Sequence, residues 1–202
     1  MNATVLIIGC GALAHELVGL QRRNQWTHVR IQCLPADLHN TPDLIPDAVR
    51  KALDRYSSGY AHVFLAYADC GTGGALDRVL EEYGVERLPG AHCYEVFSGS
   101  RLFAQLSDEE MGTFYLTDFL VRHFDRLVKK GLGLDRHPEL MATYFGNYRR
   151  VTYLAQTHTN ELSAMARQHA KYLGLEFRQQ YTGLALLDLA VQKSCINGFS
   201  EL

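Results

Sequence analysis

The chain has 202 residues, of which 47% are hydrophobic and 21% are charged, so it can fill a core and is unlike a disordered tail. Its 20 basic and 22 acidic residues give a net charge of −2, which excludes the electrostatic footprint of a protein that binds nucleic acid or an anionic membrane. This length suits one sizeable α/β domain or two very small ones, and we expect a single domain over residues 1–202.

The start of the chain lacks the features of a secretory signal. Residues 1–4 carry no basic side chain, and the apolar run at residues 5–8 is too short for the core of a signal peptide. No run reaches the ~20 apolar residues of a membrane-spanning helix. The five cysteines are an odd number, which favours thiols, ligands or core residues over a disulfide framework. We therefore expect a cytoplasmic protein that makes no membrane contact.

The first part of the chain alternates strand and helix patterns. Residues 5–8 are a continuous apolar run, typical of a strand buried on both faces of a parallel sheet. The run ends in Gly9-Cys10-Gly11, and the pattern then predicts a helix over residues 12–23. A second strand is predicted at residues 29–34 and a second helix at residues 44–56.

The same unit then repeats. Residues 62–67 predict a third strand, which a glycine-rich loop at residues 68–74 follows. A helix at residues 76–83 ends at Gly84, and a short strand at residues 85–88 comes next. Strand, glycine loop, helix and strand make a βαβ unit, which predicts an α/β fold with a mostly parallel sheet, right-handed crossovers and flanking helices.

The middle of the chain is expected to be a helical insertion near residues 107–150. Ser107 followed by Glu110 matches a capping box, and the helix that it opens should run to about residue 130. A short helix is predicted at residues 138–145. The βαβ pattern then returns, with strands at 151–156 and 175–178 and helices at 161–173 and 184–192.

Three cysteines follow predicted strands closely. Cys10 and Cys70 lie in glycine-rich turns, and Cys93 lies with His92 and Glu95 behind a Pro-Gly turn. Because the carboxyl ends of parallel strands share one edge of a sheet, we expect these turns to meet. Thiolate and imidazole are zinc ligands, so the pattern predicts a site for zinc, or another transition metal, held by Cys10, Cys70, His92 and Cys93.

In this hypothesis His92 or Glu95 completes the metal shell or acts as a catalytic acid or base. The spacing lacks the paired C-x-x-C of strong zinc motifs. The alternative is that the cysteines are small residues filling tight turns, and that His92 is bonded to a backbone carbonyl.

Residues 9–14 also match the G-x-G-x-x-A form of the dinucleotide fingerprint, between a strand and a helix, so Gly9 and Gly11 are candidate cofactor-binding residues. The motif also requires an acidic residue at the end of the second strand. The candidate is Asp37, which lies beyond that end, in the loop that follows. Gly71 and Gly73 are a second candidate, since backbone N–H groups at a helix start can cradle an anion. The planar guanidinium of Arg149 suits a carboxylate or phosphate, with a solvated arginine as the alternative.

Taken together, the motifs resemble the family catalogued as domain of unknown function 1638. The segments that carry the resemblance are Ile7-Ile8-Gly9-Cys10-Gly11-Ala12-Leu13, Ala68-Asp69-Cys70-Gly71-Thr72-Gly73-Gly74 with Leu76-Asp77, His92-Cys93-Tyr94-Glu95 and Leu116-Thr117-Asp118-Phe119-Leu120. Members often occur beside corrinoid-dependent methyltransferase systems for methylated amines. The resemblance thus implies a role in methyl-group metabolism, with a small-molecule substrate or a corrinoid or methyltransferase protein as partner.

The residues and the resemblance fit a zinc-binding protein of one-carbon metabolism, acting as an enzyme or as an accessory factor. Zinc keeps a coordinating thiol deprotonated, which suits methyl transfer and contact with a corrinoid. The chain lacks the D-x-H-x-x-G element of corrinoid carriers, so we do not expect it to be the carrier. Two other hypotheses are a dinucleotide-binding oxidoreductase that uses the Gly9-Cys10-Gly11 turn, and a non-catalytic partner protein whose cysteines are structural.

Overall fold

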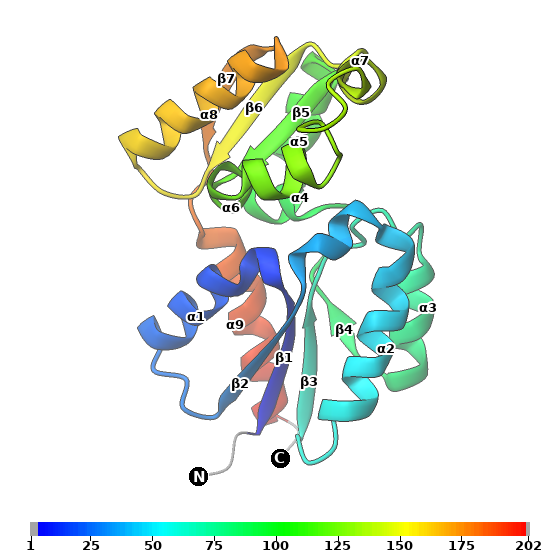
Figure 1. The fold of residues 1–202 in the computed structure, drawn as a ribbon. Coiled ribbons are helices and arrows are strands. Elements are labelled where there is room, and N and C mark those ends of the chain that lie inside the picture. Colours follow the sequence, from blue (N-terminus) through cyan, green and yellow to red (C-terminus); the bar gives the residue numbers. More distant parts are fainter. Residues whose placement is uncertain (1–3, 201–202) are drawn as a thin grey trace. The chain divides into compact units, whose positions relative to one another are not determined.

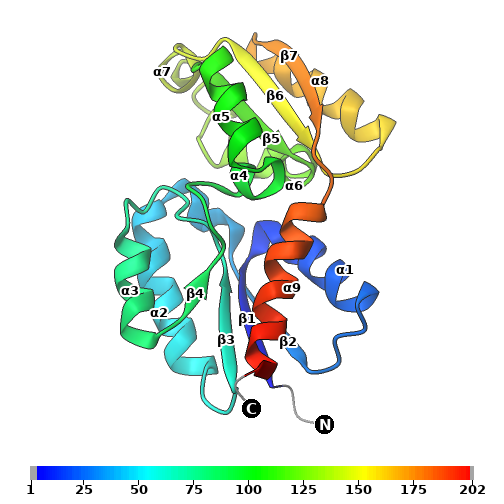
Figure 2. The same cartoon turned by 180° about the vertical axis from the view of Figure 1, so that it is seen from behind.

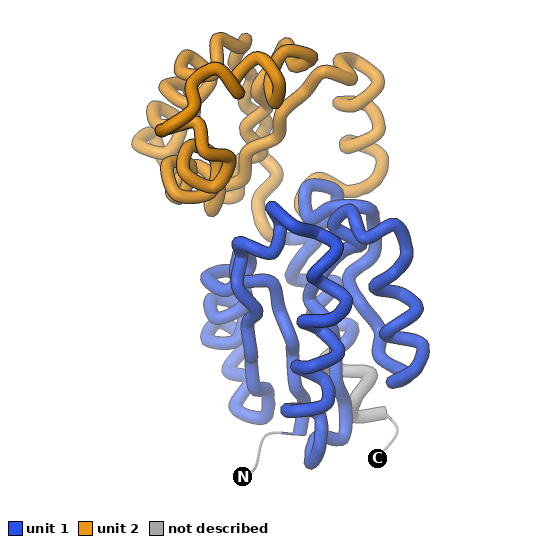
Figure 3. The backbone as a smooth tube through the Cα atoms, turned by 45° about the vertical axis from the view of Figure 1, so that its right-hand side comes forward, with its two compact units in different colours: residues 1–96, 185–202 blue, residues 97–184 orange. Residues whose placement is uncertain are grey.

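The chain forms two compact units, each with a parallel sheet of its own. The structure, a computed structural model, describes the backbone of residues 4–200 and the side chains of residues 4–194. The first unit comprises Met1–Val96 and Ala185–Leu202, and the second comprises Phe97–Leu184 (Figure 3). The first unit is therefore built from two stretches of chain, between which the second unit is inserted.

The sheet of the first unit has four strands in the order β2-β1-β3-β4 (Figure 1). Its neighbouring strands are all parallel. The strands are β1 (Val5–Cys10), β2 (Val29–Leu34), β3 (His62–Ala66) and β4 (Glu86–Arg87). The carboxyl ends of these strands share one edge of the sheet. We call it the thiol edge because Cys10 ends β1 there, and Cys70 and Cys93 follow β3 and β4 in the chain.

Helices cover both faces of this sheet. They are α1 (Ala14–Arg23), α2 (Ile45–Tyr56), α3 (Ala75–Tyr83) and α9 (Ala185–Ser200), with α4 (Cys93–Ser98) leading towards the second unit. Right-handed crossovers place α1 on one face and α2 with α3 on the other. Helix α9 contacts β3, and its Asp188 meets Arg23 and Asn24 at the end of α1, so α9 and α1 share a face (Figure 2).

The layered arrangement explains the sequence pattern of the first unit. All six residues of β1 are buried, because both faces of a central parallel strand are covered by helices. Leu17 and Leu20 of α1 and Val49 and Leu53 of α2 supply the helical side of the core, at 0–1% exposure. Burying a leucine or valine side chain stabilises the fold by about 1.5–3 kcal/mol before entropy costs are counted.

The second unit has a three-stranded parallel sheet in the order β5-β6-β7. The strands are β5 (Thr113–Thr117), β6 (Arg150–Ala155) and β7 (Glu176–Tyr181). The helices are α5 (Ser100–Glu109), α6 (Asp118–Arg122), α7 (Leu140–Phe145) and α8 (Asn160–Leu173), and a π-helical turn, η4, spans Asp125–Lys130. Leu116, Phe124, Tyr153 and Ala166 lie in its core with no exposed surface.

The predicted α/β class, with parallel strands and flanking helices, is confirmed. The expected single sheet is instead two sheets, because the strands of the last third pair with β5 and not with the first unit. Whether the two units unfold together, as one domain over residues 1–202 would, stays a prediction. Within the described residues, no helix combines the length and the apolar character needed to cross a lipid bilayer.

The helix expected from about 108 to 130 is wrong. Ser107 lies inside α5, and the segment at 113–117 is strand β5. Gly112 explains the change, because its carbonyl accepts bonds from the N–H groups of Arg149 and Arg150, which start the pairing with β6. The five residues that follow are aromatic, β-branched or leucine, and their strand pairing outweighs the local capping pattern.

Candidate functional site

The thiol edge brings the predicted cysteine turns together. Cys10 ends β1, Cys70 follows β3 by four residues, and Cys93 is the first residue of α4. The N–H of Cys70 donates to the carbonyl of Ala91 over 2.8 Å, and the N–H of Asp69 donates to that of Gly90 over 3.1 Å. These two bonds hold the loop of Cys70 beside the loop that carries Cys93.

The three thiols are protonated at neutral pH because their surroundings disfavour the thiolate. Burial raises the pKa of Cys10 to about 12, and the charge of Cys70 adds to the effect. Burial raises the pKa of Cys70 to about 11, although backbone N–H groups, including that of Cys93, donate to its sulfur and oppose the change. The pKa of Cys93 is raised by burial, then by the charges of Cys70 and Cys10. Each thiol therefore lies within electrostatic reach of the others.

His39 contacts Cys10, and it was not among the predicted site residues. It belongs to η2 (Ala36–Asn40), a short 3-10 helix that follows β2. The Sγ atom of Cys10 lies 3.6 Å from its Nδ1 and 3.9 Å from its Nε2. Burial lowers the pKa of His39, so the ring is neutral at pH 7. The sequence contained a signal for His39. Residues 29–34 are predicted to be a strand of the parallel sheet, and the loop after such a strand reaches the same edge as Cys10.

Tyr67 is the second residue that the sequence reading missed. Its ring stacks on His39 with the centroids 6.2 Å apart and the planes 11° from parallel. Only 1% of the residue is exposed, so its ring and hydroxyl are both part of the buried edge of the sheet. Burial raises the pKa of Tyr67, and the charge of Cys10 adds to the effect, so the hydroxyl lies near that thiol.

His92 lies in the loop that leads to Cys93, and Glu95 lies in the first turn of α4. His92 is exposed, and its ring lies 6.1 Å from that of Tyr94. The carboxylate of Glu95 accepts from the N–H of Ala91 over 2.9 Å, and a Cβ atom on Gly90 would lie only 2.7 Å from it. Glu95 thus closes the turn at Gly90. The catalytic roles of both residues stay predictions.

The structure gives packing reasons for Gly9 and Gly11. A Cβ atom on Gly9 would lie 2.6 Å from the side chain of Leu17, and one on Gly11 would lie 2.7 Å from the carbonyl oxygen of Leu34. The N–H of Ala12 donates to the sulfur of Cys10 over 3.3 Å, so the helix start already has an acceptor. Cofactor binding by these glycines stays a prediction.

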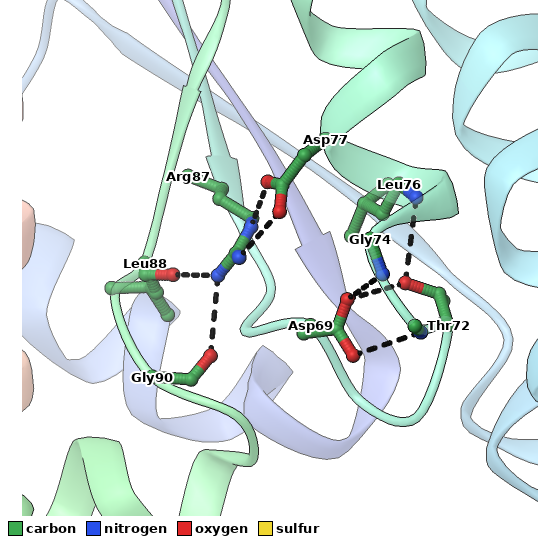
Figure 4. Close-up of polar contacts among 9 residues, drawn as sticks. Asp69, Thr72, Gly74, Leu76, Asp77, Arg87, Leu88 and Gly90 are labelled. Carbon is green, nitrogen blue, oxygen red and sulfur yellow. Dashed lines mark hydrogen bonds and ion pairs between the residues drawn. The ribbon is translucent and has the colours of Figure 1, made fainter.

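The amides of Gly73 and Gly74 also have a partner, the carboxylate of Asp69 (Figure 4). It accepts from the hydroxyl of Thr72 over 2.7 Å and from the N–H groups of Gly73 over 3.1 Å and Gly74 over 2.9 Å. Burial raises the pKa of Asp69, but these bonds outweigh it and the net pKa is lowered. An anionic cofactor bound by the amide of Gly73 would have to displace this carboxylate, and cofactor binding by Gly71 and Gly73 stays a prediction.

Arg149 belongs to the second unit, where it is exposed and directly precedes β6. Its N–H donates to the carbonyl of Gly112, so it lies at the amino ends of the strands of that sheet. Ligand binding by Arg149 stays a prediction.

The carboxyl edge of the second sheet holds a buried carboxylate, Asp118, which is 1% exposed. It accepts from the hydroxyl of Tyr153 over 2.6 Å, the N–H of Gln156 over 3.0 Å and the hydroxyl of Thr157 over 2.6 Å. The side chain of Gln156 in turn accepts from the N–H of Asp118 over 2.7 Å. These bonds satisfy the carboxylate within its own unit and tie α6 to β6.

Arg87 fastens the loop that leads to Cys93 (Figure 4). Its guanidinium forms a two-point pair with Asp77 at 2.6 and 2.9 Å and donates to the carbonyls of Leu88 at 2.8 Å and Gly90 at 3.2 Å.

We expect Arg87→Ala to lower the free energy of unfolding by about 1–2 kcal/mol. The pair with the half-exposed Asp77 is screened by solvent and contributes little, and the two hydrogen bonds to the carbonyls are lost. Urea unfolding measures this.

Arg87→Lys is the control, because it keeps the charge and loses the planar fork. It should fall between the wild type and the alanine variant. An alanine variant as stable as the wild type would show that the loop does not depend on this guanidinium.

Among the described side chains, no three His, Cys, Asp or Glu residues form an arrangement that would hold a metal ion. The side chains predicted to bind a metal thus lie at the thiol edge, but they do not surround a common point as the ligands of a bound ion would. A metal ion would bind only if these side chains moved towards it.

Comparison with known proteins gives one match. Residues 33–190 match the family model described as a protein of unknown function (DUF1638), which covers more than half of the chain. The chain belongs to the DUF1638 family. The matched part of this DUF1638 member contains His39, Tyr67, Cys70 and Cys93, whereas Cys10 precedes it. No curated protein and no solved structure matches the chain.

Proposed function

We propose that the thiol edge binds a soft divalent metal ion, with zinc as the first choice, through the thiolates of Cys10, Cys70 and Cys93. The observation that carries the proposal is that these cysteines gather at one edge of the sheet: Cys10 ends β1, and the N–H of Cys70, which follows β3, donates to the carbonyl of Ala91, two residues before Cys93. Thiolate ligands select zinc and other soft ions over magnesium or calcium.

A divalent cation removes the factors that keep these thiols protonated. In the absence of a cation, burial and mutual repulsion oppose each thiolate. A bound ion would offset both, and the thiols would release their protons to the solvent as it binds.

The wider role that we propose is in methyl-group metabolism in the cytoplasm, as an enzyme or an accessory factor beside a corrinoid or methyltransferase protein. A zinc-bound thiolate stays deprotonated at neutral pH, which suits an acceptor or activator of a methyl group. Support for this role comes from the family resemblance, which implies a place beside such systems. Free thiols at the four described cysteines suit a reducing compartment.

The first test is the metal content of the protein purified without a histidine tag under anaerobic conditions with added zinc. We expect about one zinc ion per wild-type chain and near-complete loss in Cys93→Ser, because three thiolates are the main source of affinity. Cys33→Ser is the matched control, since Cys33 is a half-buried thiol within β2 that is not a proposed ligand. A metal-free wild type, or equal metal in Cys93→Ser, would remove the basis of the proposal.

A further inference from the structure

We propose that strand β7 is a docking edge for a second copy of the chain. The two copies would join their sheets through antiparallel β7 strands related by a two-fold axis. This interaction goes beyond the proposed function and does not depend on a metal ion. Three features of β7 support it: the direction of its backbone groups, its lack of edge protection and the self-complementarity of its sequence.

Strand β7 directs alternate backbone groups away from its own sheet. It is an outer strand in the order β5-β6-β7 and lies beside β6 (Figure 2). The N–H groups of Glu176 and Thr182 donate to carbonyls on the β6 side, so the even-numbered residues of β7 bond to β6. The backbone N–H and C=O groups that point outward are therefore those of Phe177, Gln179 and Tyr181.

Most of these outward groups lack a partner. Among the described residues, no hydrogen bond is made by the backbone N–H groups of Phe177, Gln179 and Tyr181 or by the carbonyls of Phe177 and Gln179. The carbonyl of Tyr181 accepts from the side-chain amide of Gln180 over 3.0 Å and keeps a second lone pair. A row of open donors and acceptors on an edge strand is a template for another strand.

Strand β7 also lacks the features that protect edge strands from pairing, which include shortness, proline and lysine. It has six residues, with no proline and no lysine. Its two charged side chains form ion pairs within the second unit, Arg178 with Glu109 and Glu176 with Arg150. By contrast, β4 at an edge of the first sheet spans two residues, and Pro89 follows it closely.

The sequence of β7 is complementary to itself in one antiparallel register. If the two-fold axis passes between the Gln179 residues of the two copies, Phe177 lies opposite Tyr181 and Arg178 lies opposite Gln180. Each outward-pointing residue then exchanges both of its backbone bonds with an outward-pointing residue of the other strand. A register with Phe177 opposite Gln179 would instead oppose the two Arg178 side chains, and like charges directly opposite each other are destabilising.

The side chains on the α8 face of β7 suit this pairing. Tyr181 is 46% exposed, stacks on His158 and would gain Phe177 of the second copy as a cross-strand aromatic neighbour. Gln179 accepts from the hydroxyl of Ser163 over 2.6 Å and places a neutral amide at the axis. These outward-pointing residues carry no net charge, so a second β7 complements them better than a strongly basic or acidic segment would.

The experiment measures sedimentation velocity of the wild type, Gln179→Ala and Gln179→Pro over a range of concentrations. We expect the wild type and Gln179→Ala to dimerise with similar affinity, because alanine keeps the backbone N–H. Dimerisation of Gln179→Pro should be at least about 10-fold weaker, because each copy loses one hydrogen bond at the axis. Proline should not disturb the fold, since this N–H points outward and proline is tolerated on edge strands. Circular dichroism and urea unfolding check the fold.

Cysteine cross-linking tests the register. Gln179→Cys should form an intermolecular disulfide with oxidised glutathione, since Cα atoms about 5.5 Å apart in a hydrogen-bonded pair suit a disulfide. Gln180→Cys is the control, because it would face Arg178 and not its own copy. The wild type is oxidised in parallel, since the chain has five cysteines.

A wild type that stays monomeric at every concentration would overturn the proposal and leave the edge to a strand of another protein. Equal dimerisation of Gln179→Pro and Gln179→Ala would overturn it too, because the dimer would then use another surface. Cross-linking of Gln180→Cys in preference to Gln179→Cys would exclude the register on which the choice of partner rests.

Discussion

Replacing Asp118 with alanine is expected to lower the free energy of unfolding by about 3 kcal/mol or more, because three donors, two of them in buried residues, lose their acceptor at once. The donors are the hydroxyls of Tyr153 and Thr157 and the N–H of Gln156, all within 3.0 Å of the carboxylate. The carboxylate is 1% exposed, so water cannot replace these bonds without opening the edge of the sheet. The variant should also leave a small cavity beside α6.

Guanidinium unfolding measures the total loss, and hydrogen exchange of the amides in β5 and β6 shows that it arises in the second unit. Tyr153→Phe is the control, since it removes one donor and leaves the carboxylate with two; its expected cost is about 1 kcal/mol. If Asp118→Ala were no less stable than Tyr153→Phe, the network would not be a major source of stability.

Gly11→Val is expected to destabilise the first unit by about 3 kcal/mol, because the new Cβ atom meets backbone and not a flexible side chain. That atom would lie 2.7 Å from the carbonyl oxygen of Leu34 and 3.0 Å from the nitrogen of Ala36. The segment after β2 must then move, and His39 moves with it. The variant should therefore lose stability, and the contact between His39 and Cys10 should be disturbed.

Gly19→Val is the matched control for thermal unfolding, since Gly19 lies in α1 with no atom within 4 Å of its virtual Cβ. It should be at least as stable as the wild type, because valine favours a helix more than glycine does. Equal stability of the two variants would show that the segment at Leu34 adapts freely.

The Gly11 variant is not a test of dinucleotide binding, since it damages the fold with or without a cofactor. Direct titration of the wild type with nicotinamide and flavin cofactors is the suitable test.

The first unit was largely predictable because its signals are local. Runs such as residues 5–8 are apolar on both faces, and a glycine turn and an amphipathic helix follow them, so the βαβ units and their parallel strands could be inferred. The meeting of Cys10, Cys70 and Cys93 follows from the same rule, since parallel strands end at one edge.

The rest depended on contacts between distant residues. The division into two sheets follows from which strands pair, and residues 113–117 carry no local sign that they pair with residues 150–154. The capping pattern at Ser107 was a weak local preference that strand pairing overrode. His39 was missed because its place beside Cys10 requires β2 to neighbour β1, a fact about strand order and not about the spacing of motifs.

The return of α9 to the first sheet has a consequence for the order of events during synthesis. Leu187 and Val191 of α9 are fully buried, and the helix contacts β3. The ribosome must finish the whole second unit before this helix can emerge, so one face of β3 stays uncovered in the nascent chain. Chaperone binding to that face should consequently persist until residues beyond 185 leave the exit tunnel.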